Sequence, residues 1–280
     1  MTSPKRVLVT GSKGFIGSNL VRTLTKLGYH VQEWTQDIRT VDSLKDPNDT
    51  VFHLAAITNQ DRFKTEPYHC FDVNVQGTVS VLEYCKAMGA KCIYPSTSGV
   101  YAKGDSICVD ESSEISPASH YATSKWIGEE LCQLEGKLGN VTSTILRLFN
   151  VYGPGQKQPF VIPYITDGLA NDKNITIETP NSVRDFVHIS DVVDSLVKSD
   201  KTSESGCHIY NIGSGIPTTI LDLARLCEDI SCTFGKIATT LGASEKQSGV
   251  YANTQKAQVN LGWHHQKNLA DGLQTLINQE

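Results

Sequence analysis

The first half of the chain alternates short apolar runs with longer segments whose apolar residues recur at helical spacing. The apolar runs are typical of buried β-strands and lie at 7–10, 31–34, 50–56, 91–95 and 142–148. The segments between them predict helices at 18–27, 67–88 and 119–137, and Gly28 and Gly89 end the first two. Strands that alternate with helices form βαβ units, so we expect an α/β fold with a doubly wound parallel sheet.

The pattern changes after Tyr152. Gly153, Pro154, Gly155 and Pro159 indicate a loop, and the apolar segments beyond them are shorter and more irregular. We therefore expect a smaller C-terminal α/β region there.

Composition excludes several classes of protein. Hydrophobic residues make up 39% and charged residues 20% of the 280 positions, which is typical of a globular chain rather than a disordered one. The net charge of −5 leaves no basic surplus for a nucleic-acid partner. No apolar run approaches the ~18 residues of a membrane span, and residues 1–9 do not resemble a signal peptide. We expect a cytoplasmic protein without a membrane partner.

The eight cysteines contain no Cys-x-x-Cys pair, and the histidines are scattered. This spacing does not match a zinc site, so we expect no metal ligands and mostly packed, reduced thiols.

A glycine-rich turn follows the first strand. Residues 7–17 read VLVTGSKGFIG, so Gly11, Gly14 and Gly17 lie between a strand and a helix. In this setting the first glycine permits a tight turn, the second lets the backbone approach a pyrophosphate, and the third lets the helix pack on the strand. The helix N-terminus adds N–H donors. The turn therefore predicts a dinucleotide site of the Rossmann type.

The residue that reads the ribose of the dinucleotide is less clearly specified. Asp37 follows the second strand and could accept hydrogen bonds from ribose hydroxyls, which favours NAD. Arg39 could instead bind a 2′-phosphate, which favours NADP. Both could also be loop residues on a solvated edge. We favour NAD and keep NADP as the alternative.

A tyrosine and a lysine lie four residues apart in the third predicted helix, and hence on one face of it. Tyr121 has a phenol that is a poor base at neutral pH, and the ammonium of Lys125 would favour its phenolate. The phenol could then exchange a proton with a substrate hydroxyl or carbonyl. The hydroxyl-rich segment 95–101 follows the fourth strand, where open α/β sheets bind ligands.

In this order, the segments resemble the extended short-chain dehydrogenase/reductases, in particular the NAD-dependent sugar epimerase/dehydratase family. Eight motifs match over nearly the whole chain: TGSKGFIG at 10–17, FHLAA at 52–56, NVQGT at 74–78, STSGVY at 96–101, YATSK at 121–125, LRLFNVYGPG at 146–155, RDFVHISD at 184–191 and YNIGSG at 210–215. Eight ordered matches are far more specific than any one of them.

The resemblance implies a role for individual residues. Thr97 would hydrogen-bond the reacting sugar oxygen, Tyr121 would be the acid/base, and Lys125 would bind the nicotinamide ribose and lower the pKa of Tyr121. Cofactor contacts are implied for Gly11, Gly14, Phe15, Ile16, Gly17, Asp37, Ile38, Leu54, Ala55, Ala56, Asn74, Tyr121 and Lys125. Substrate contacts are implied for Thr97, Ser98, Asn150 and Arg184.

Asn150 and Arg184 would contact the diphosphate of a nucleotide-sugar substrate, for which an arginine is a charge-assisted partner. The alternative for Arg184 is an ion pair with Asp185.

The resemblance also implies the domain organisation. It places an NAD(P)-binding Rossmann domain at 1–156, with 184–213 returning to it, and a smaller substrate-binding region at 157–183 and 214–280. The helix around Trp126 lies where family members form a dimeric bundle, which implies a homodimer.

The chain departs from the family beside Thr97. The 4,6-dehydratases carry Asp-Glu where this chain has Ser98 and Gly99, and Gly99 cannot act as acid, base or nucleophile. What remains is hydride and proton transfer at one carbon. We expect a nucleotide-sugar epimerase acting at C4 through a 4-keto intermediate. An NAD(P)H-dependent 4-keto-sugar reductase is the alternative, and a non-catalytic dinucleotide-binding sensor is a remote one.

A second departure concerns the nucleotide half of the substrate. Gln247 and Asn253 stand where many members carry an arginine and an aspartate, and Lys246 is one residue away from compensating. The chain is also short for the family between Trp34 and Asp37 and between 215 and 253. The sugar, its nucleotide and the direction of reaction stay open.

Overall fold

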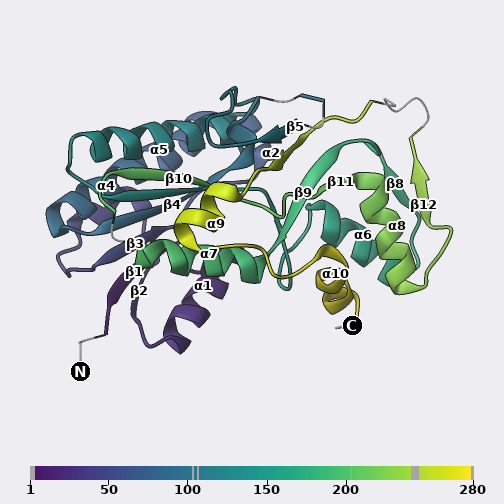
Figure 1. Ribbon diagram of the computed structural model, residues 1–280, viewed down its shortest axis with the longest axis horizontal. Helices are drawn as coiled ribbons and strands as arrows, with labels where there is room; N and C mark the ends of the chain where they lie inside the picture. The colour runs from purple at the N-terminus through teal and green to yellow at the C-terminus, as the bar shows by residue number, and fades with distance from the viewer. Residues whose placement is uncertain (1–3, 103, 106, 203, 241–245, 279–280) are drawn as a thin grey trace.

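The computed structural model describes residues 4–102, 104–105, 107–202, 204–240 and 246–278. A six-stranded sheet occupies one end of the elongated molecule, and smaller sheets and helices occupy the other (Figure 1). All neighbours in the large sheet are parallel, in the order β10 (Cys207–Ile212), β6 (Ser143–Leu148), β4 (Lys91–Thr97), β3 (Thr50–His53), β1 (Arg6–Thr10) and β2 (His30–Trp34). The predicted doubly wound parallel sheet is confirmed.

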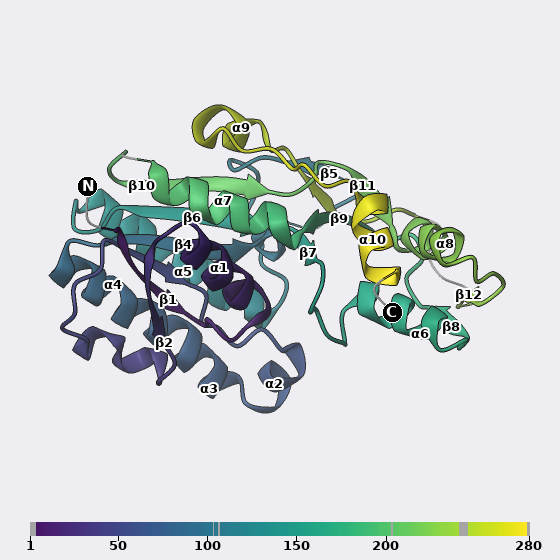
Figure 2. The ribbon, with the colours of Figure 1, turned by 90° about the horizontal axis from the view of Figure 1, so that it is seen from below.

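The central strands are buried along their whole length because both faces of the sheet are covered, as β3 and β6 show. Val7 and Val9 of β1 point into one hydrophobic core, and Leu8 between them points into the other. Three helices cover the first face, and two long helices with shorter turns cover the second (Figures 1 and 2). The first set is α1 (Phe15–Lys26), α7 (Ile189–Lys201) and α9 (Gln255–Leu261), and the second is α4 (Gly77–Met88) and α5 (His120–Lys137).

The predicted helix at 67–88 is interrupted. It consists of α3 (Pro67–Phe71), a π-helical turn η2 (Asp72–Gln76) and α4, and Gly89 ends it in the left-handed conformation. A short helix that the sequence did not predict, α2 (Gln60–Thr65), precedes it. Asn59 caps α2 by accepting from the backbone N–H groups of Asp61 and Arg62.

The short segment after the second strand forms the 3-10 helix η1 (Ile38–Ser43). Its buried Ile38 and Val41 pack into the same core as Leu82 and Tyr84 of α4. β2, which precedes this segment, is an edge strand of the large sheet.

The smaller region is built around three small sheets. One sheet joins β11 (Pro217–Thr219), β9 (Val183–His188) and β7 (Asn150–Tyr152), and two pairs join β12 (Ile237–Thr239) to β8 (Ile175–Ile177) and β13 (Val250–Ala252) to β5 (Ile107–Val109). The 3-10 turn η3 (Ser98–Val100) follows β4. Helices α6 (Val161–Ala170), α8 (Ile220–Ser231) and α10 (Leu269–Ile277) share a core with Ile165, Leu223, Cys227 and Leu273 fully buried.

Parts of the chain cross between the two regions. Within 184–213, β10 lies in the large sheet whereas β9 lies in a small one. Ala257 and Trp263 pack into the core of the large sheet, although we expected 214–280 in the smaller region. Trp263 Nε1 also donates to the backbone O of Asp191 on α7, at 2.9 Å. The domain boundaries themselves stay a prediction.

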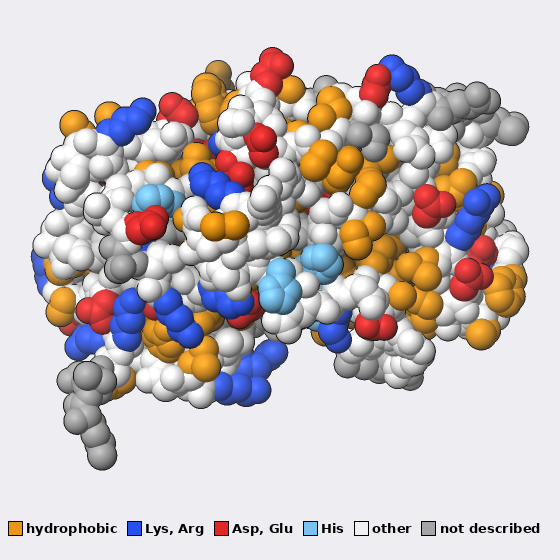
Figure 3. All heavy atoms as spheres, in the orientation of Figure 1, with side chains coloured by type: hydrophobic (Ala, Val, Ile, Leu, Met, Phe, Trp, Pro, Cys, Tyr) orange, Lys and Arg blue, Asp and Glu red, His pale blue; other side chains and the backbone are white. Residues whose placement is uncertain are grey.

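On the face shown in Figure 3, acidic and basic side chains are interspersed, and hydrophobic side chains gather over the smaller region. Across the described residues, no helix has the length and apolar character of a membrane span. No group of three His, Cys, Asp or Glu side chains in that part of the chain is placed to hold a metal ion. All eight cysteines are free thiols.

Candidate active site

The most prominent hollow near the predicted motifs lies at the carboxyl ends of β1 and β3. From β1 the chain runs to β2 on one side of it and then crosses to β3 on the other side. Open α/β sheets bind ligands at such a switch point. The hollow has a volume of about 500 Å³. It is lined by Gly11, Gly14, Gln36, Asp37, Ile38, Arg39, Leu54, Ala55, Ala56, Ile57, His69 and Val73.

Two glycines of the turn are required by close approaches of backbone. A Cβ on Gly11, whose φ is +66°, would lie 2.6 Å from the backbone N of Ala55. A Cβ on Gly17 would lie 2.1 Å from the backbone O of Gly11, so only glycine lets α1 approach the turn. Gly14 precedes α1, whose first N–H groups are free to meet an anion. The cradle fits the pyrophosphate of a dinucleotide. Phe15 and Ile16 form the first turn of α1.

The ribose end of the hollow carries one cation between two carboxylates. Arg39 donates from its backbone N and from Nε to Asp37, at 3.0 and 2.9 Å. The other end of the guanidinium forms an ion pair with Asp72 of η2. Hydrogen bonds from Arg39 lower the pKa of Asp37 to about 2. Asp37 and Arg39, the two candidates for binding the adenosine ribose or its 2′-phosphate, therefore both lie at this hollow, and Arg39 is already paired with a carboxylate on each side.

Helix α5 presents Tyr121 and Lys125 one turn apart. Ser119 caps the helix by accepting from the backbone N of Ala122, at 3.2 Å. Lys125 is 4% exposed, and its Nζ lies 3.8 Å from the centre of the Tyr94 ring on β4. Burial lowers the pKa of Lys125 to about 8, and raises the pKa of Tyr121 to about 12. In the cofactor-free protein the phenol is therefore neutral and needs a cation to ionise.

An aromatic cluster that the sequence did not predict surrounds Tyr121. Phe63 of α2 lies 6.2 Å from the Tyr121 ring, in edge-to-face geometry, and also contacts Phe71 and His120. Phe63 is 2% exposed. No local motif marks this residue, because its contact with Tyr121 spans 58 positions of sequence and exists only in the folded chain.

Thr97 lies at the carboxyl end of β4, opposite Leu148 of β6. Its Oγ1 accepts from the backbone N of Gly99 at 3.1 Å, which leaves its O–H available to donate. A Cβ on Gly99 would lie 3.4 Å from both Thr97 Oγ1 and the Cβ of Ala122, next to Tyr121. Gly99 thus separates Thr97 from the first turn of α5. Ser98 begins η3 beside them.

Asn150 and Arg184 lie on neighbouring strands of one small sheet. Asn150 Nδ2 donates to the backbone O of Asp185, at 3.2 Å. Arg184 Nη1 donates to Ser182 Oγ and to the backbone O of Val183, at 2.6 and 2.8 Å, and burial lowers its pKa. Among the described residues, no carboxylate lies within ion-pair distance of Arg184.

Asp185 is engaged elsewhere. Its carboxylate accepts from the backbone N of Ser214, Gly215 and Ala252, at 2.6, 2.9 and 3.0 Å. The alternative of an Arg184–Asp185 ion pair is therefore wrong, because the carboxylate is used to hold the turn after β10 against β9 and β13.

Asn74, predicted to contact the cofactor, lies behind the hollow. It is 3% exposed, and its amide pairs with the backbone N and O of Ile57, at 2.7 and 3.0 Å. Its effect on a cofactor would act through the wall residue Ile57.

Two residues of the second sequence departure have structural partners. Lys246 forms an ion pair with Asp105, and Asn253 Oδ1 accepts from the backbone N of Gln255 at the start of α9.

Several lining residues were absent from the predicted site. Gln36 and Ile57 adjoin predicted residues in sequence, so extending each motif by one position would have found them. His69 and Val73 come from α3 and η2. Val73 could have been predicted because it precedes the predicted residue Asn74, whereas no sequence motif marks His69.

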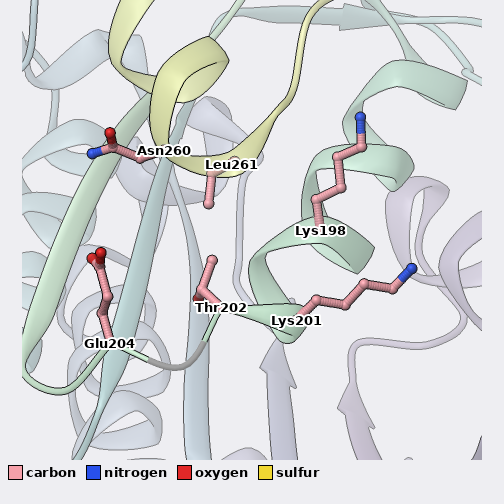
Figure 4. A pocket seen from close by; sticks show the side chains of 6 residues that line it. All are labelled: Lys198, Lys201, Thr202, Glu204, Asn260 and Leu261. Atoms are coloured by element: carbon pink, nitrogen blue, oxygen red, sulfur yellow. The ribbon is translucent and has the colours of Figure 1, made fainter.

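A second hollow, of about 340 Å³, lies where α7 ends near α9. Lys198 donates to the backbone O of Gly262 at 2.8 Å and forms an ion pair with Asp194. Figure 4 shows the side chains of Lys198 and Lys201 pointing away from Asn260 and Glu204. The lining groups do not converge, so this hollow is not a candidate site.

Comparison with known proteins adds to this geometry. The model of the NAD dependent epimerase/dehydratase family matches residues 7–213. A putative UDP-glucose 4-epimerase of Methanocaldococcus jannaschii is 29% identical, and the alignment covers 97% of each chain.

Two solved structures are similar over almost their full length. The UDP-glucose 4-epimerase of Thermotoga maritima, solved with UDP-glucose, superposes with a TM-score of 0.89 at 26% identity, over 98% of this chain and 97% of that one. The UDP-glucuronic acid 4-epimerase of Bacillus cereus, solved with UDP-glucuronic acid and NAD, superposes with a TM-score of 0.88 at 29% identity, over 98% and 99%.

Proposed function

Because the chain belongs to the NAD-dependent epimerase/dehydratase family, we propose that it interconverts the C4 epimers of a nucleotide-activated sugar through a 4-keto intermediate. The family makes it an NAD-dependent enzyme of the extended short-chain dehydrogenase/reductase type. The two solved 4-epimerases hold UDP-sugars, so a UDP-hexose is the substrate class that we propose.

The observation that carries this proposal is Gly99. Elimination of water or loss of carbon dioxide needs an acid, base or nucleophile in addition to the group that removes the hydroxyl proton. The position beside Thr97 that would offer such a group has no side chain, and its backbone N is used to orient Thr97. Oxidation and reduction at one carbon, with exchange of one proton, is the chemistry that Thr97, Tyr121 and Lys125 support.

Each of these residues has a distinct task. The Thr97 hydroxyl donates to the reacting oxygen. Tyr121, as its phenolate, takes the proton from that oxygen and later returns it as the phenol. The Lys125 ammonium, which lies 3.8 Å from the centre of the Tyr94 ring, would stabilise the phenolate electrostatically. Bound NAD supplies the acceptor and donor for hydride. An epimerase needs the cofactor to remain bound while the keto sugar rotates, because hydride must return to the opposite face of the same carbon.

The hollow favours NAD over NADP. The glycine cradle and α1 would hold the pyrophosphate, and Asp37 would accept from the ribose hydroxyls. A 2′-phosphate would meet two carboxylates, Asp37 and Asp72, that already pair with Arg39. Like charges at this corner disfavour NADP.

The diphosphate of the substrate would meet Arg184 and Asn150. Arg184 is half-buried without a carboxylate partner among the described residues, so a substrate phosphate would provide the missing counter-charge. Asn150 lies two residues beyond Leu148, the neighbour of Thr97 in the sheet, which places it at the same edge as the catalytic groups.

The direct test is turnover without added cofactor. The purified protein is incubated with UDP-glucose, UDP-galactose, UDP-glucuronic acid and the corresponding N-acetylhexosamines, and the products are followed by proton NMR. We expect one C4 epimer pair to interconvert with NAD retained. Strict consumption of external NADH or NADPH would instead identify a 4-keto reductase, and NAD binding without conversion of any sugar would favour a sensor.

Tyr121→Phe tests the role of the acid/base. Removing only the hydroxyl should lower kcat at least a thousandfold and leave the Kd for NAD within a factor of three. Tyr68→Phe is the matched control, because Tyr68 is 90% exposed on α3. Activity of Tyr121→Phe close to that of the control would contradict the assignment.

A further inference from the structure

Behind the wall of the NAD hollow runs a series of buried polar side chains, which we name the His53 relay: Thr10, His53, Thr78, Asn74 and Ser124. They come from β1, β3, α4, η2 and α5, and each is 3% exposed or less. None lies on the described lining of the hollow. Their neighbours in sequence, Gly11 and Leu54, do line it, so the relay holds the wall from behind.

The hydrogen bonds around His53 run in one direction. The backbone N of Ala55 donates to Thr10 Oγ1 at 3.1 Å, and Thr10 Oγ1 lies 3.0 Å from His53 Nδ1. Thr78 Oγ1 donates to the backbone O of Asn74 at 2.7 Å, so it is an acceptor for His53 Nε2, 3.1 Å away. The neutral imidazole with its proton on Nε2 satisfies every partner in this series.

The surroundings keep the imidazole neutral. His53 is 1% exposed, and its ring centre lies 5.7 Å from that of Tyr94, over which the ammonium of Lys125 sits. Burial, together with the positive charge of Lys125, lowers the pKa of His53 to about 3. The neutral imidazole therefore accepts one hydrogen bond and donates another. Because it carries no charge, it does not repel the ammonium of Lys125.

The relay continues to the catalytic helix. Asn74 holds Ile57 of the wall through two hydrogen bonds, and its Nδ2 donates to Ser124 Oγ at 2.9 Å. Ser124 Oγ in turn donates to the backbone O of Tyr121 at 2.8 Å. The glycine turn, the wall at 55–57 and the first turns of α5 are thus connected by one set of bonds.

We propose that His53 is a positioning residue of the NAD site, which as a neutral bridge fixes the wall at 55–57 relative to the glycine turn and to the helix of Tyr121 and Lys125. The proposal rests on the NAD binding of the proposed function. It assigns to His53 no contact with NAD and no proton transfer. Its effect is to keep the hollow open in the shape that the dinucleotide needs.

The test uses three substitutions of His53, with the Kd for NAD and the melting temperature of the cofactor-free protein as readouts. His53→Phe removes both bonds. His53→Asn places an oxygen where Nδ1 accepts from Thr10, and His53→Gln places an amide where Nε2 donates to Thr78. We expect His53→Phe to raise the Kd for NAD at least tenfold. His53→Asn should recover most of that loss and His53→Gln less of it, because the bond to Thr10 is the one that connects His53 to the glycine turn and, through Ala55, to the wall.

Thr50→Val is the matched control, since Thr50 is a buried threonine of the same strand. Its hydroxyl donates to Asp200 at the opposite end of the sheet, at 2.6 Å. It should lower the melting temperature and leave the Kd unchanged. Thr10→Val keeps the proposal testable should His53→Phe fail to fold, and it should raise the Kd to a similar extent.

Three results would overturn the proposal. His53→Phe could bind NAD within twofold of the original protein, Thr50→Val could weaken binding as much as His53→Phe, or His53→Asn could show no recovery. Failure of the unsubstituted protein to bind NAD would instead refute the proposed function, and the role of His53 would fall with it.

Discussion

At the scale of single residues, the buried ammonium of Lys125 lowers the stability of the folded protein. Its ammonium is buried, and the folded protein lowers its pKa from 10.5 to about 8. Between about pH 8 and 10.5 the unfolded chain therefore binds more protons at this residue than the folded one, so stability rises with pH in that window. Below about pH 8 the full cost of burying the charge is present.

Replacement of Lys125 by methionine should stabilise the cofactor-free protein. The gain at pH 7 should be about 1–3 kcal/mol: lowering the pKa from 10.5 to about 8 corresponds to about 3 kcal/mol at ~1.4 kcal/mol per pH unit, and the lost contact with Tyr94 reduces it. It should shrink between pH 8 and 10. Urea unfolding at pH 7 and pH 9.5 measures both, with the exposed Lys64→Met as control. A gain that does not change with pH would contradict the assigned cause.

Asp37 should determine the choice between the two cofactors. In Asp37→Ala, Arg39 loses one of its two carboxylates and becomes available to a 2′-phosphate, while the ribose hydroxyls lose their acceptor. The ratio of the NADP Kd to the NAD Kd should fall at least tenfold, measured by fluorescence titration. Asp61→Ala removes a carboxylate whose ion pair with Lys64 lies outside the hollow, and should leave the ratio unchanged. An equal ratio in both variants would exclude Asp37 as the selecting residue.

At the scale of elements, helix α5, which carries Tyr121 and Lys125, is attached to the sheet through Glu129. Tyr121, Lys125 and Glu129 recur every fourth residue and share one face of the helix. The Glu129 carboxylate accepts from Arg147 of β6, at 2.8 Å from Nη2 and 3.1 Å from Nε, and both side chains are buried. Arg147 Nη1 also donates to the Tyr101 hydroxyl at 3.0 Å. This buried pair attaches α5 to β6.

Breaking this pair should destabilise the protein strongly. Glu129→Gln leaves the Arg147 guanidinium buried without a counter-charge, which should cost about 3–5 kcal/mol in urea unfolding. Asp61→Asn breaks an exposed ion pair on α2 and should cost less than about 1 kcal/mol. Similar costs for the two variants would mean that water reaches Arg147.

At the scale of the whole molecule, the assembly of the chain stays a prediction. Family resemblance implies a homodimer through the helix around Trp126, which is α5. Leu134 and Leu138 are 51% and 62% exposed, one turn apart on that helix, which fits a covered apolar stripe. Trp126, by contrast, packs within the chain, against the cluster of Val100 and Tyr101.

Sedimentation equilibrium should give twice the mass of one chain. Leu134→Glu together with Leu138→Glu should halve it, because two charges cannot be buried in an apolar interface. Val259→Glu, at a 75% exposed position on α9, is the control. A monomer before substitution would refute the expected dimer.

The elements that local pattern predicts well are the buried strands and the long helices. Their positions follow from apolar runs and from glycine ends, which neighbouring residues decide. The π-helical turn at 72–76 and the helix α2 were missed, since their reason lies in contacts made by Asn74 and Phe63 with segments about 50–60 residues away. The 3-10 helix after β2 could not be predicted from local sequence either, because it depends on the packing of Ile38 with α4.

The sequence alone determined the family, the sheet and the identity of the catalytic candidates, because motif order and apolar periodicity depend on residues that are close together in the sequence. Only the tertiary structure decided the electrostatic state of the site. Arg39 is paired with a carboxylate 33 positions away, Asp185 accepts from backbone N–H groups of a distant turn and a distant strand, and His53 is neutral near a buried Lys125. Burial and hydrogen-bond partners set these properties, and both arise only when distant segments pack together.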